Sequence, residues 1–270
     1  MNRYIFMLLL SFLSSSLLGQ KVYWKSNYGK TNAPVGGMKN VKDIIKKEFV
    51  YPASCITNNI EGAIDIKYKL NKQGIPIISS ISGTDNEAIK AETKRMFLKI
   101  RFSKSNLRTD NDPDDLFQIT FSIKNWDKLS NKRKYQEINY PHLPIDSTEK
   151  VYKYQLLKIK PKPIYQKKES YSSFNNYISS KLTYPEEAFK IGLKGEVVIS
   201  FIIEQSGQIT NIEVLKPLPS GCTEEGLRLI KALKWYPAIV DGKAVRTLMT
   251  SSIGFGVASN AFQESFNQGR

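Results

Sequence analysis

The chain carries the same set of landmark residues twice. Tyr51-Pro52, Gly62 and Gly74 in the first half correspond to Tyr184-Pro185, Gly195 and Gly207 in the second half at one constant offset of 133 residues. Self-similarity at a fixed offset indicates a chain built from two copies of one structural unit. With 270 residues, 41% of them hydrophobic, the chain is long enough for two domains that each have a core.

The residues that follow the first glycine of each set alternate between apolar and polar side chains. The apolar members are Ile64, Ile66, Tyr68 and Leu70 in the first unit, and Val197, Ile199, Phe201 and Ile203 in the second. This period of two predicts a strand with one buried face. Gly74 and Gly207 predict tight turns, because glycine adopts a positive φ without steric cost. Each unit is therefore expected to contain a β-hairpin.

A helix and a final strand are expected after each hairpin. Thr84 and Glu87 have the spacing of a capping box at a helix start, and Glu224 and Glu225 favour a helix N-terminus in the second unit. Residues 116–123 and 245–255 are predicted as the last strands, and short amphipathic segments precede each Tyr-Pro pair. The predicted fold class is α+β, with two units that each combine a three-stranded antiparallel sheet and two helices in the order α-β-β-α-β.

The first residues of the chain have the pattern of a signal peptide. Residues 1–19 contain one basic residue, Arg3, then an apolar run, and end at the small residue Gly19. The apolar run is shorter than the ~20 residues that a membrane-spanning helix needs. We therefore predict export and cleavage near Gly19-Gln20. The alternative is an uncleaved segment that anchors the protein in the inner membrane.

We predict units at residues 34–125 and 173–257, a linker at 126–172 and a tail at 258–270. From Lys124 to Glu169 there are twelve Lys or Arg and five Asp or Glu, a net charge of +7 out of +15 for the whole chain. The Pro-x-Pro sequence of this linker favours an extended polyproline II spacer. Residues 151–159, VYKYQLLKI, fit a strand that pairs with a neighbouring sheet equally well. Both readings stay open at this point.

The sequence does not favour an enzyme. His142 is the single histidine, and the chain has no nucleophile elbow, phosphate-binding loop or cluster of metal-ligand residues. We therefore predict no catalytic residue, no cofactor and no metal. Cys55 and Cys222 are expected to be unpaired, buried thiols, with one disulfide between the two halves as the alternative.

The second unit carries an ordered set of landmarks. They are Tyr184, Pro185, Gly195, Gly207, Trp235, Pro237 and Gly242. With these residues, the unit closely resembles the C-terminal domain of the energy transducer TonB over about 80 residues. The first unit is a weaker copy, because Arg101-Phe102-Ser103 stands where the second unit has Trp235-Tyr236-Pro237.

The resemblance implies a periplasmic protein that binds an extended peptide of an outer-membrane TonB-dependent receptor, or of another envelope protein, in transport across the outer membrane. Binding is expected by addition of a strand to the edge of the sheet. The implied peptide-binding strand consists of Val245, Arg246, Thr247, Leu248, Met249, Thr250, Ser251 and Ser252. Tyr184-Pro185 and Trp235 are interpreted as structural residues, because proline fixes φ and a large aromatic side chain anchors a core.

Two other interactions stay open. The same strand edges could pair two copies of the chain into a homodimer. As an alternative function, the basic linker could attach the protein to an anionic envelope polymer, which would make it a scaffold without energy transduction. Nucleic acid is not expected as a partner, because export separates the protein from it.

Overall fold

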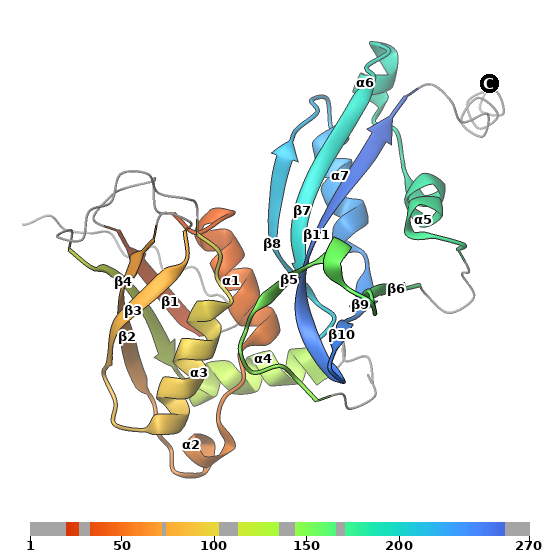
Figure 1. The fold of residues 1–270 in the computed structure, drawn as a ribbon. Coiled ribbons are helices and arrows are strands. Elements are labelled where there is room, and N and C mark those ends of the chain that lie inside the picture. The colour runs from red at the N-terminus through yellow and green to blue at the C-terminus, as the bar shows by residue number, and fades with distance from the viewer. Residues whose placement is uncertain are drawn as a thin grey trace, which may run out of the picture.

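The computed structural model describes residues 20–26, 33–71, 74–102, 113–134, 144–165 and 171–256. Within these residues the chain forms two α+β units that lie side by side (Figure 1). We call residues 20–134 the first unit and residues 144–256 the second unit. The predicted α+β fold class is confirmed.

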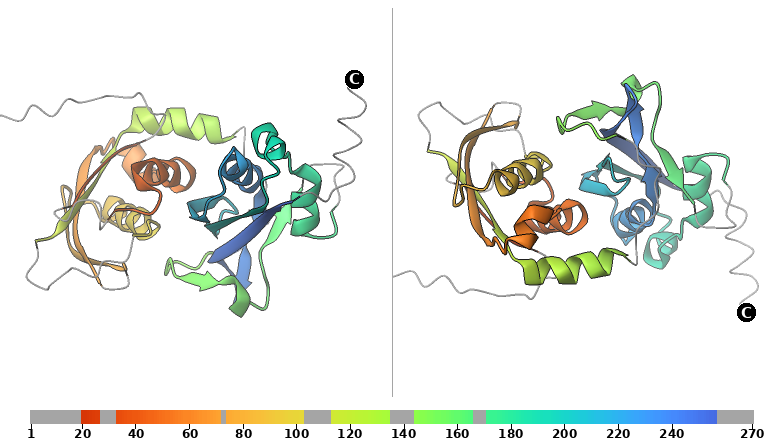
Figure 2. Two further views of the ribbon diagram at one scale, coloured as in Figure 1. Left: turned by 90° about the horizontal axis from the view of Figure 1, so that it is seen from above. Right: turned by 90° about the horizontal axis from the view of Figure 1, so that it is seen from below.

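The first unit contains an antiparallel sheet with the strand order β1-β4-β2-β3. Its strands are β1 (Lys21–Lys25), β2 (Gly62–Leu70), β3 (Pro76–Ser82) and β4 (Asp115–Phe121), and its helices are α1 (Gly37–Glu48), α2 (Ala53–Thr57), α3 (Glu87–Leu98) and α4 (Ile123–Lys134). Figure 2 shows α1 and α3 on the face of this sheet that points toward the second unit. Phe49, Phe97 and Phe117 are buried between these helices and the sheet.

The second unit contains a larger sheet with the order β10-β11-β7-β8, in which β5 also pairs with β11, and a separate β6-β9 pair. Its strands are β5 (Val151–Lys153), β6 (Lys162–Ile164), β7 (Gly195–Ile203), β8 (Ile209–Lys216), β9 (Lys234–Tyr236), β10 (Ala238–Val240) and β11 (Lys243–Phe255), and its helices are the 3-10 helix η2 (Tyr154–Leu156), α5 (Phe174–Lys181), α6 (Glu186–Lys190) and α7 (Cys222–Lys231). Helices α5 and α7 contribute Ile178 and Leu229 to a core that includes Ile199 and Phe201 of β7.

The two units share one pairing register. Strand β2 begins at Gly62, which lies opposite Phe121 of β4, and β7 begins at Gly195, which lies opposite Phe255 of β11. In both units the end of the last strand therefore pairs antiparallel with the start of the first hairpin strand, at the equivalent glycine. A residue of β4 corresponds to the residue of β11 that is 134 positions later.

The repeated Tyr-Pro pairs form the same corner in both units. The Tyr51 hydroxyl donates a hydrogen bond to the carbonyl of Ile60 at 2.6 Å, and the Tyr184 hydroxyl donates to the carbonyl of Leu193, also nine residues later. The following proline is the N-cap of a short helix in each unit, with φ of −60° in α2 and −61° in α6. The repeated landmarks thus hold equivalent structural positions.

Helix α3 does not begin with the predicted capping box. The side chain of Asn86 accepts from the backbone N–H of Ile89 at 3.1 Å, so Asn86 rather than Thr84 is the N-cap. The Thr84 hydroxyl instead accepts from the backbone N–H of Asn86. The predicted N-cap was wrong by two residues, because Thr and Asn side chains can both accept from the unpaired amides at the start of a helix.

Both sheets have more strands than the three predicted for each unit. Strand β1 lies beside β4 in the first unit, and β5 and β10 pair with β11 in the second. Strands β1 and β5 pair with residues far along the chain, such as Lys21 with Thr120 and Val151 with Arg246. Local sequence patterns do not report pairings of this kind.

The predicted linker folds onto both units. Helix α4 begins at Ile123, its Leu129 is buried in the first core, and Arg133 donates to the carbonyls of Ile45, Lys46 and Phe49 at the end of α1. The linker prediction was therefore wrong for residues 126–134. Residues 151–153 form β5, which decides in favour of the strand reading for that segment.

The remaining predictions concern the two chain ends, His142, the cysteines and membrane-spanning helices. Residues 1–19, His142 and the tail 258–270 lie outside the described residues. Cys55 and Cys222 are buried and unpaired, one in each core. Across the described ranges, none of the helices has the length and apolar character that a membrane span requires.

Candidate functional site

The outer edge of β11 is the candidate site. On its inner side, β11 pairs with β7 from Thr247 to Phe255 without a register shift. On its outer side, the chain from residue 144 to 153 covers only the first half of the strand: Ile145 bridges to Ala244, and β5 pairs with residues 246–248. At η2 the chain turns away, and no described strand pairs with the outer side of β11 beyond Leu248.

The backbone groups that point to the outer side can be assigned from Ala244. Its N–H donates to the Pro144 carbonyl at 2.7 Å, and its carbonyl accepts from the Asp146 N–H at 3.0 Å. Successive residues of a strand direct these groups to opposite sides, so every second residue after Ala244 faces outward. Beyond the part covered by β5, these residues are Thr250, Ser252 and Gly254, and we call them the open edge.

The eight residues predicted as the peptide-binding strand divide into two groups. Val245, Arg246 and Thr247 are buried, and Arg246 and Leu248 face β5. These residues therefore belong to contacts within the chain. Met249, Thr250, Ser251 and Ser252 lie beyond β5, and among them Thr250 and Ser252 are exposed. The open edge also includes Gly254, which the sequence prediction did not reach.

The first unit shows how a strand can occupy this edge. Strand β1 pairs antiparallel with the outer side of β4, from Lys21 opposite Thr120 to Lys25 opposite Leu116. By the shared register, Leu116, Gln118 and Thr120 of β4 correspond to Thr250, Ser252 and Gly254 of β11. The open edge of the second unit is therefore the counterpart of the edge that β1 fills in the first.

The landmark residues of the second unit shape the sheet and its turns. A Cβ atom on Gly195 would lie 2.8 Å from Cδ1 of Leu218, and a Cβ on Gly221 would lie 3.1 Å from Cβ of Pro185. Gly207 and Gly242 adopt φ of 73° in the β7-β8 and β10-β11 turns. These positions define the path of β7 and β11 and so hold the open edge in place.

Trp235 and Pro237 lie where the chain returns from α7 to β11. Trp235 is 1% exposed and packs against Phe174 of α5 and Phe201 of β7. Its backbone N–H donates to the Gly207 carbonyl at 3.0 Å. Pro237 separates β9 from β10. Trp235 thus contacts core residues and Pro237 lies between two strands, and neither residue lies on the open edge.

A buried ionic cluster joins the two units at the covered end of β11. Arg246 pairs with Glu204 through two hydrogen bonds, Nε to Oε2 at 2.8 Å and Nη2 to Oε1 at 3.0 Å. From the first unit, Lys99 Nζ contacts Glu204 at 2.9 Å and Glu149 at 3.0 Å, and Glu48 at 3.5 Å. We call these five residues the junction cluster. Sequence reasoning missed it, because no local pattern marks a buried charge.

The charges of the junction cluster are unequal, with three carboxylates and two cations. Burial disfavours the charged form of Glu204, but Arg246 and Lys99 outweigh this effect and lower its pKa to about 2. For Glu48, burial dominates over the attraction of Lys99 and raises the pKa. The cluster therefore fixes the covered half of β11 against the first unit, and it leaves the Glu48 carboxyl with a raised pKa.

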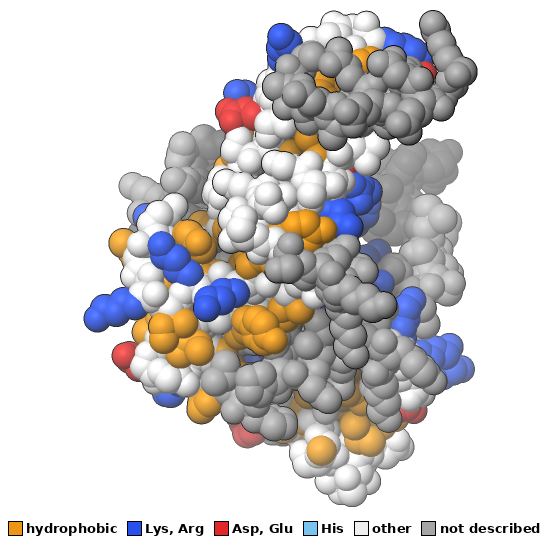
Figure 3. All heavy atoms as spheres, turned by 90° about the vertical axis from the view of Figure 1, so that its right-hand side faces the viewer, with side chains coloured by type: hydrophobic (Ala, Val, Ile, Leu, Met, Phe, Trp, Pro, Cys, Tyr) orange, Lys and Arg blue, Asp and Glu red, His pale blue; other side chains and the backbone are white. Residues whose placement is uncertain are grey.

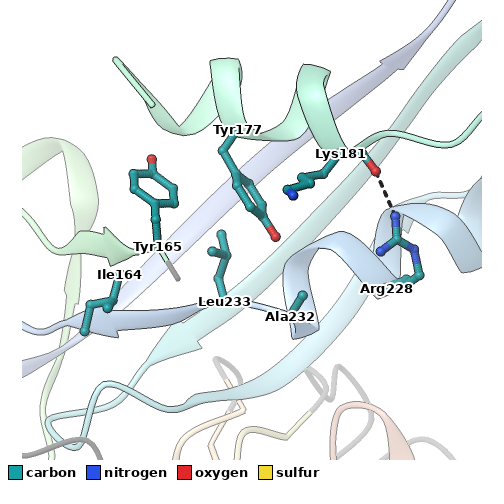
Figure 4. Close-up of a pocket in the computed structure, with 7 residues that line it drawn as sticks. All are labelled: Ile164, Tyr165, Tyr177, Lys181, Arg228, Ala232 and Leu233. Carbon is teal, nitrogen blue, oxygen red and sulfur yellow. Dashed lines mark hydrogen bonds between the residues drawn. The ribbon is translucent and has the colours of Figure 1, made fainter. Parts of the chain in front are cut away.

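A small cavity of about 210 Å³ lies between β6, α5 and α7 (Figure 4). Tyr165, Tyr177 and Leu233 contribute to its lining. Arg228 also lines it, but its guanidinium is held by Glu225 at 2.7 Å and by the carbonyl of Lys181 at 2.9 Å. This cation is already used within the fold, so the cavity is a weaker candidate than the open edge.

Metal ligands and basic side chains bear on other kinds of site. No group of three His, Cys, Asp or Glu side chains in the described ranges could hold a metal ion. Figure 3 shows basic and hydrophobic side chains, and fewer acidic ones, on one face of the molecule. Residues of the basic linker form β5 and β6, and Lys150 and Lys160 lie over the rings of Tyr152 and Tyr154 respectively.

These features define an α+β protein of two similar units in which one unit presents an open strand edge. Residues 180–257 match the family model of the Gram-negative bacterial TonB protein C-terminal. Protein TonB of Yersinia enterocolitica is 29% identical over 75 residues, which cover 28% of this chain and 29% of that protein. The solution structure of the Helicobacter pylori TonB C-terminal domain is 28% identical and covers 32% of this chain and 79% of that one, with a TM-score of 0.25.

Residues 180–257 therefore form a TonB C-terminal domain. The match corresponds to less than a third of the Yersinia enterocolitica protein, at 29% of its length. The family match at residues 180–257 includes the predicted landmarks from Tyr184 to Gly242 and the whole of β11. The recognition made from the landmark residues is confirmed for the second unit.

Proposed function

We propose that this protein is a non-enzymatic periplasmic adaptor that binds an extended peptide of an outer-membrane receptor, or of another envelope protein, at the open edge. The peptide adds an antiparallel strand beside Thr250, Ser252 and Gly254. The observation that carries the proposal is the position of β1 in the first unit, which lies on the equivalent edge in this geometry. A role in transport across the outer membrane follows if the bound partner is a receptor.

The open edge sets the length and strength of the contact. Three outward residues offer three N–H and three C=O groups, and β5 ends the available edge at Leu248. A peptide of about five residues fits, as β1 does on β4. Backbone hydrogen bonds contribute ~1 kcal/mol net each, and ordering the peptide costs part of this gain. Six such hydrogen bonds give roughly 6 kcal/mol before that cost, and burial of peptide side chains adds to this. The expected dissociation constant is then on the order of micromolar.

The test uses proline at an outward position. Ser252→Pro removes an N–H from the open edge and leaves the hydrogen bonds to β7 in place, because proline is tolerated where the N–H faces away from the sheet. Ser252→Ala is the matched control, since it keeps the N–H and loses only the hydroxyl that bonds to Glu196. The probes are synthetic peptides that copy periplasmic segments of outer-membrane receptors, titrated into the full chain by calorimetry.

We expect Ser252→Pro to weaken binding at least ~10-fold, and Ser252→Ala to bind within ~2-fold of the unchanged protein. Equal binding by the proline variant would contradict strand addition. Sedimentation of the unchanged protein tests the competing occupant, a second copy of the chain. Self-association that Ser252→Pro abolishes would assign the open edge to a homodimer instead of a receptor peptide.

A further inference from the structure

Strand β1 differs from the other strands of the first sheet in how it is held. It pairs on one side only, with β4, and none of its five residues is fully buried. In β4, by contrast, every second residue is fully buried, and Phe117, Ile119 and Phe121 belong to the core. Removal of β1 would therefore leave most of the first core intact.

The side chains of β1 alternate between the core and the solvent. Val22 and Trp24 pack partly against the core, and the Trp24 indole N–H donates to the Tyr68 hydroxyl at 2.8 Å. Tyr23 points to the other side and is 49% exposed. This is the pattern of a bound extended peptide, in which backbone bonds hold the strand and alternate side chains select it.

A side chain extends this pairing by one further position. Gln20 donates from Nε2 to the Ser122 carbonyl at 2.9 Å and accepts at Oε1 from the Ser122 N–H at 2.7 Å. The Gln20 amide thus reproduces the pair of hydrogen bonds that a backbone residue would make. It is 5% exposed, so it fixes the register of β1 on β4.

We propose that the outer edge of β4 is a second strand-acceptor site, which the chain's own residues 20–25 occupy as an exchangeable ligand. Its ligand is an extended peptide with apolar side chains at the positions of Val22 and Trp24, the second of them an aromatic N–H or O–H donor that reaches Tyr68. A partner segment with this pattern replaces β1 and pairs with Leu116, Gln118 and Thr120. This site lies in the first unit and does not require the open edge of the second unit to bind anything.

The experiment releases β1 in the full chain and supplies its sequence in trans. Every protein carries Ser252→Pro, so any strand addition at the open edge is weakened and is the same in all of them. The variant Gln20→Ala/Trp24→Ala loses the amide pair and the indole contact that hold β1. The probe is a fluorescent, end-blocked peptide of residues 20–25, and binding is read by anisotropy.

We expect the released variant to bind this peptide at least ~10-fold more tightly than the protein with unchanged β1, which competes in cis. Adding Thr120→Pro, which removes an N–H that faces β1, should abolish binding, whereas Thr120→Ala should keep it. Failure of a folded released variant to bind, or equal binding after Thr120→Pro, would overturn the second site. Because the open edge is identical in all the compared proteins, neither result depends on the proposed function.

A second measurement covers a released variant that does not fold. In the unchanged protein, the amides of Gln118 and Thr120 face β1, and those of Ile119 and Phe121 face β2. Exchangeable binding of β1 predicts faster hydrogen exchange for the first pair than for the second, because only the first pair is freed by local release. The same exchange rate for both pairs would show that β1 leaves only on global unfolding and would refute the proposal.

Discussion

Arg246 and Glu204 form a two-point ion pair that is completely enclosed, with side chains that are 1% and 0% exposed. Arg246 also donates to the carbonyl of Lys99 at 3.0 Å and to that of Glu149 at 3.0 Å. One guanidinium thus connects β11, β7, the end of α3 and the segment before β5. The carbonyls of Leu98 and Lys99, which accept from Arg246, and the ion pair of Lys99 with Glu204 connect this pair to the first unit.

Removing one partner of this pair should be strongly destabilising. Glu204→Gln leaves Arg246 and Lys99 with one carboxylate fewer in a buried site, and the loss of one member of a buried pair costs about 3–5 kcal/mol. The matched control is Glu186→Gln, because Glu186 pairs with Lys190 at 2.6 Å with both side chains more than 60% exposed. The control should change the free energy of unfolding far less, because an exposed ion pair contributes little to stability.

Chemical denaturation of both variants at pH 7 checks this prediction. A cost for Glu204→Gln no larger than that of Glu186→Gln would mean that the junction cluster contributes little to stability. In that case the covered half of β11 would be held by its strand pairing with β7 and β5 alone.

Replacing Glu48 should not destabilise the protein, in contrast to replacing Glu204. Burial raises its pKa, with Lys99 opposing. A carboxyl whose pKa is raised on folding stabilises the fold below its unfolded pKa, and this contribution is lost as pH rises through the folded value. Glu48→Gln removes that loss and keeps an acceptor for the Ser206 hydroxyl. The variant should be as stable as the unchanged protein, or more stable, at pH 8.

Urea denaturation at pH 5 and pH 8 measures this effect. The unchanged protein should lose more stability between these pH values than Glu48→Gln does. An identical pH dependence of stability for the two proteins would show that burial does not raise the pKa of Glu48.

Acid should weaken the junction through Glu204. Its pKa falls from 4.5 to about 2 on folding, so its contribution is fully present above pH 4.5 and is lost as pH falls toward 2. A shift of this size corresponds to about 3 kcal/mol of unfolding free energy. Denaturation at pH 5 and pH 2.5 should show most of that drop in the unchanged protein and a smaller drop in Glu204→Gln, where residue 204 has no carboxyl to titrate.

Features set by local sequence patterns could be predicted. The alternation after Gly62 and Gly195 predicts the hairpin strands, because successive side chains of a strand point to opposite faces of the sheet. Strand β1 could not be predicted in this way, because Lys21 finds its partner Thr120 across the whole first unit. The same limit explains β5, whose pairing with β11 divides the predicted binding strand into a covered and an open part.

Charged residues mark a second limit. On sequence grounds Arg246 belongs to a strand with polar outward positions, and Lys99 ends a helix where a cation normally meets solvent. Their burial depends on contact between two units that only the folded chain brings together. Trp235 and Tyr184, by contrast, have contacts within one unit. Trp235 packs against Phe174, and the Tyr184 hydroxyl donates to the Leu193 carbonyl, as expected for structural residues.

The last prediction compares two glycines with positive φ. Gly83 has φ of 105°, and a Cβ atom there would lie 2.3 Å from the carbonyl oxygen of Ala63, a backbone atom of the β2 strand. Gly192 has φ of 61°, and nothing lies within 4 Å of the added Cβ. Gly192→Ala should therefore cost about 1 kcal/mol, which is the strain of the left-handed conformation alone. Gly83→Ala should cost clearly more, at least about 2 kcal/mol, because the first sheet must shift as well.

Thermal denaturation of both variants checks which substitution costs more stability. Equal costs would mean that the β2-β3 sheet yields freely at Gly83, and that its backbone does not form the rigid frame on which the outer edge of β4 depends.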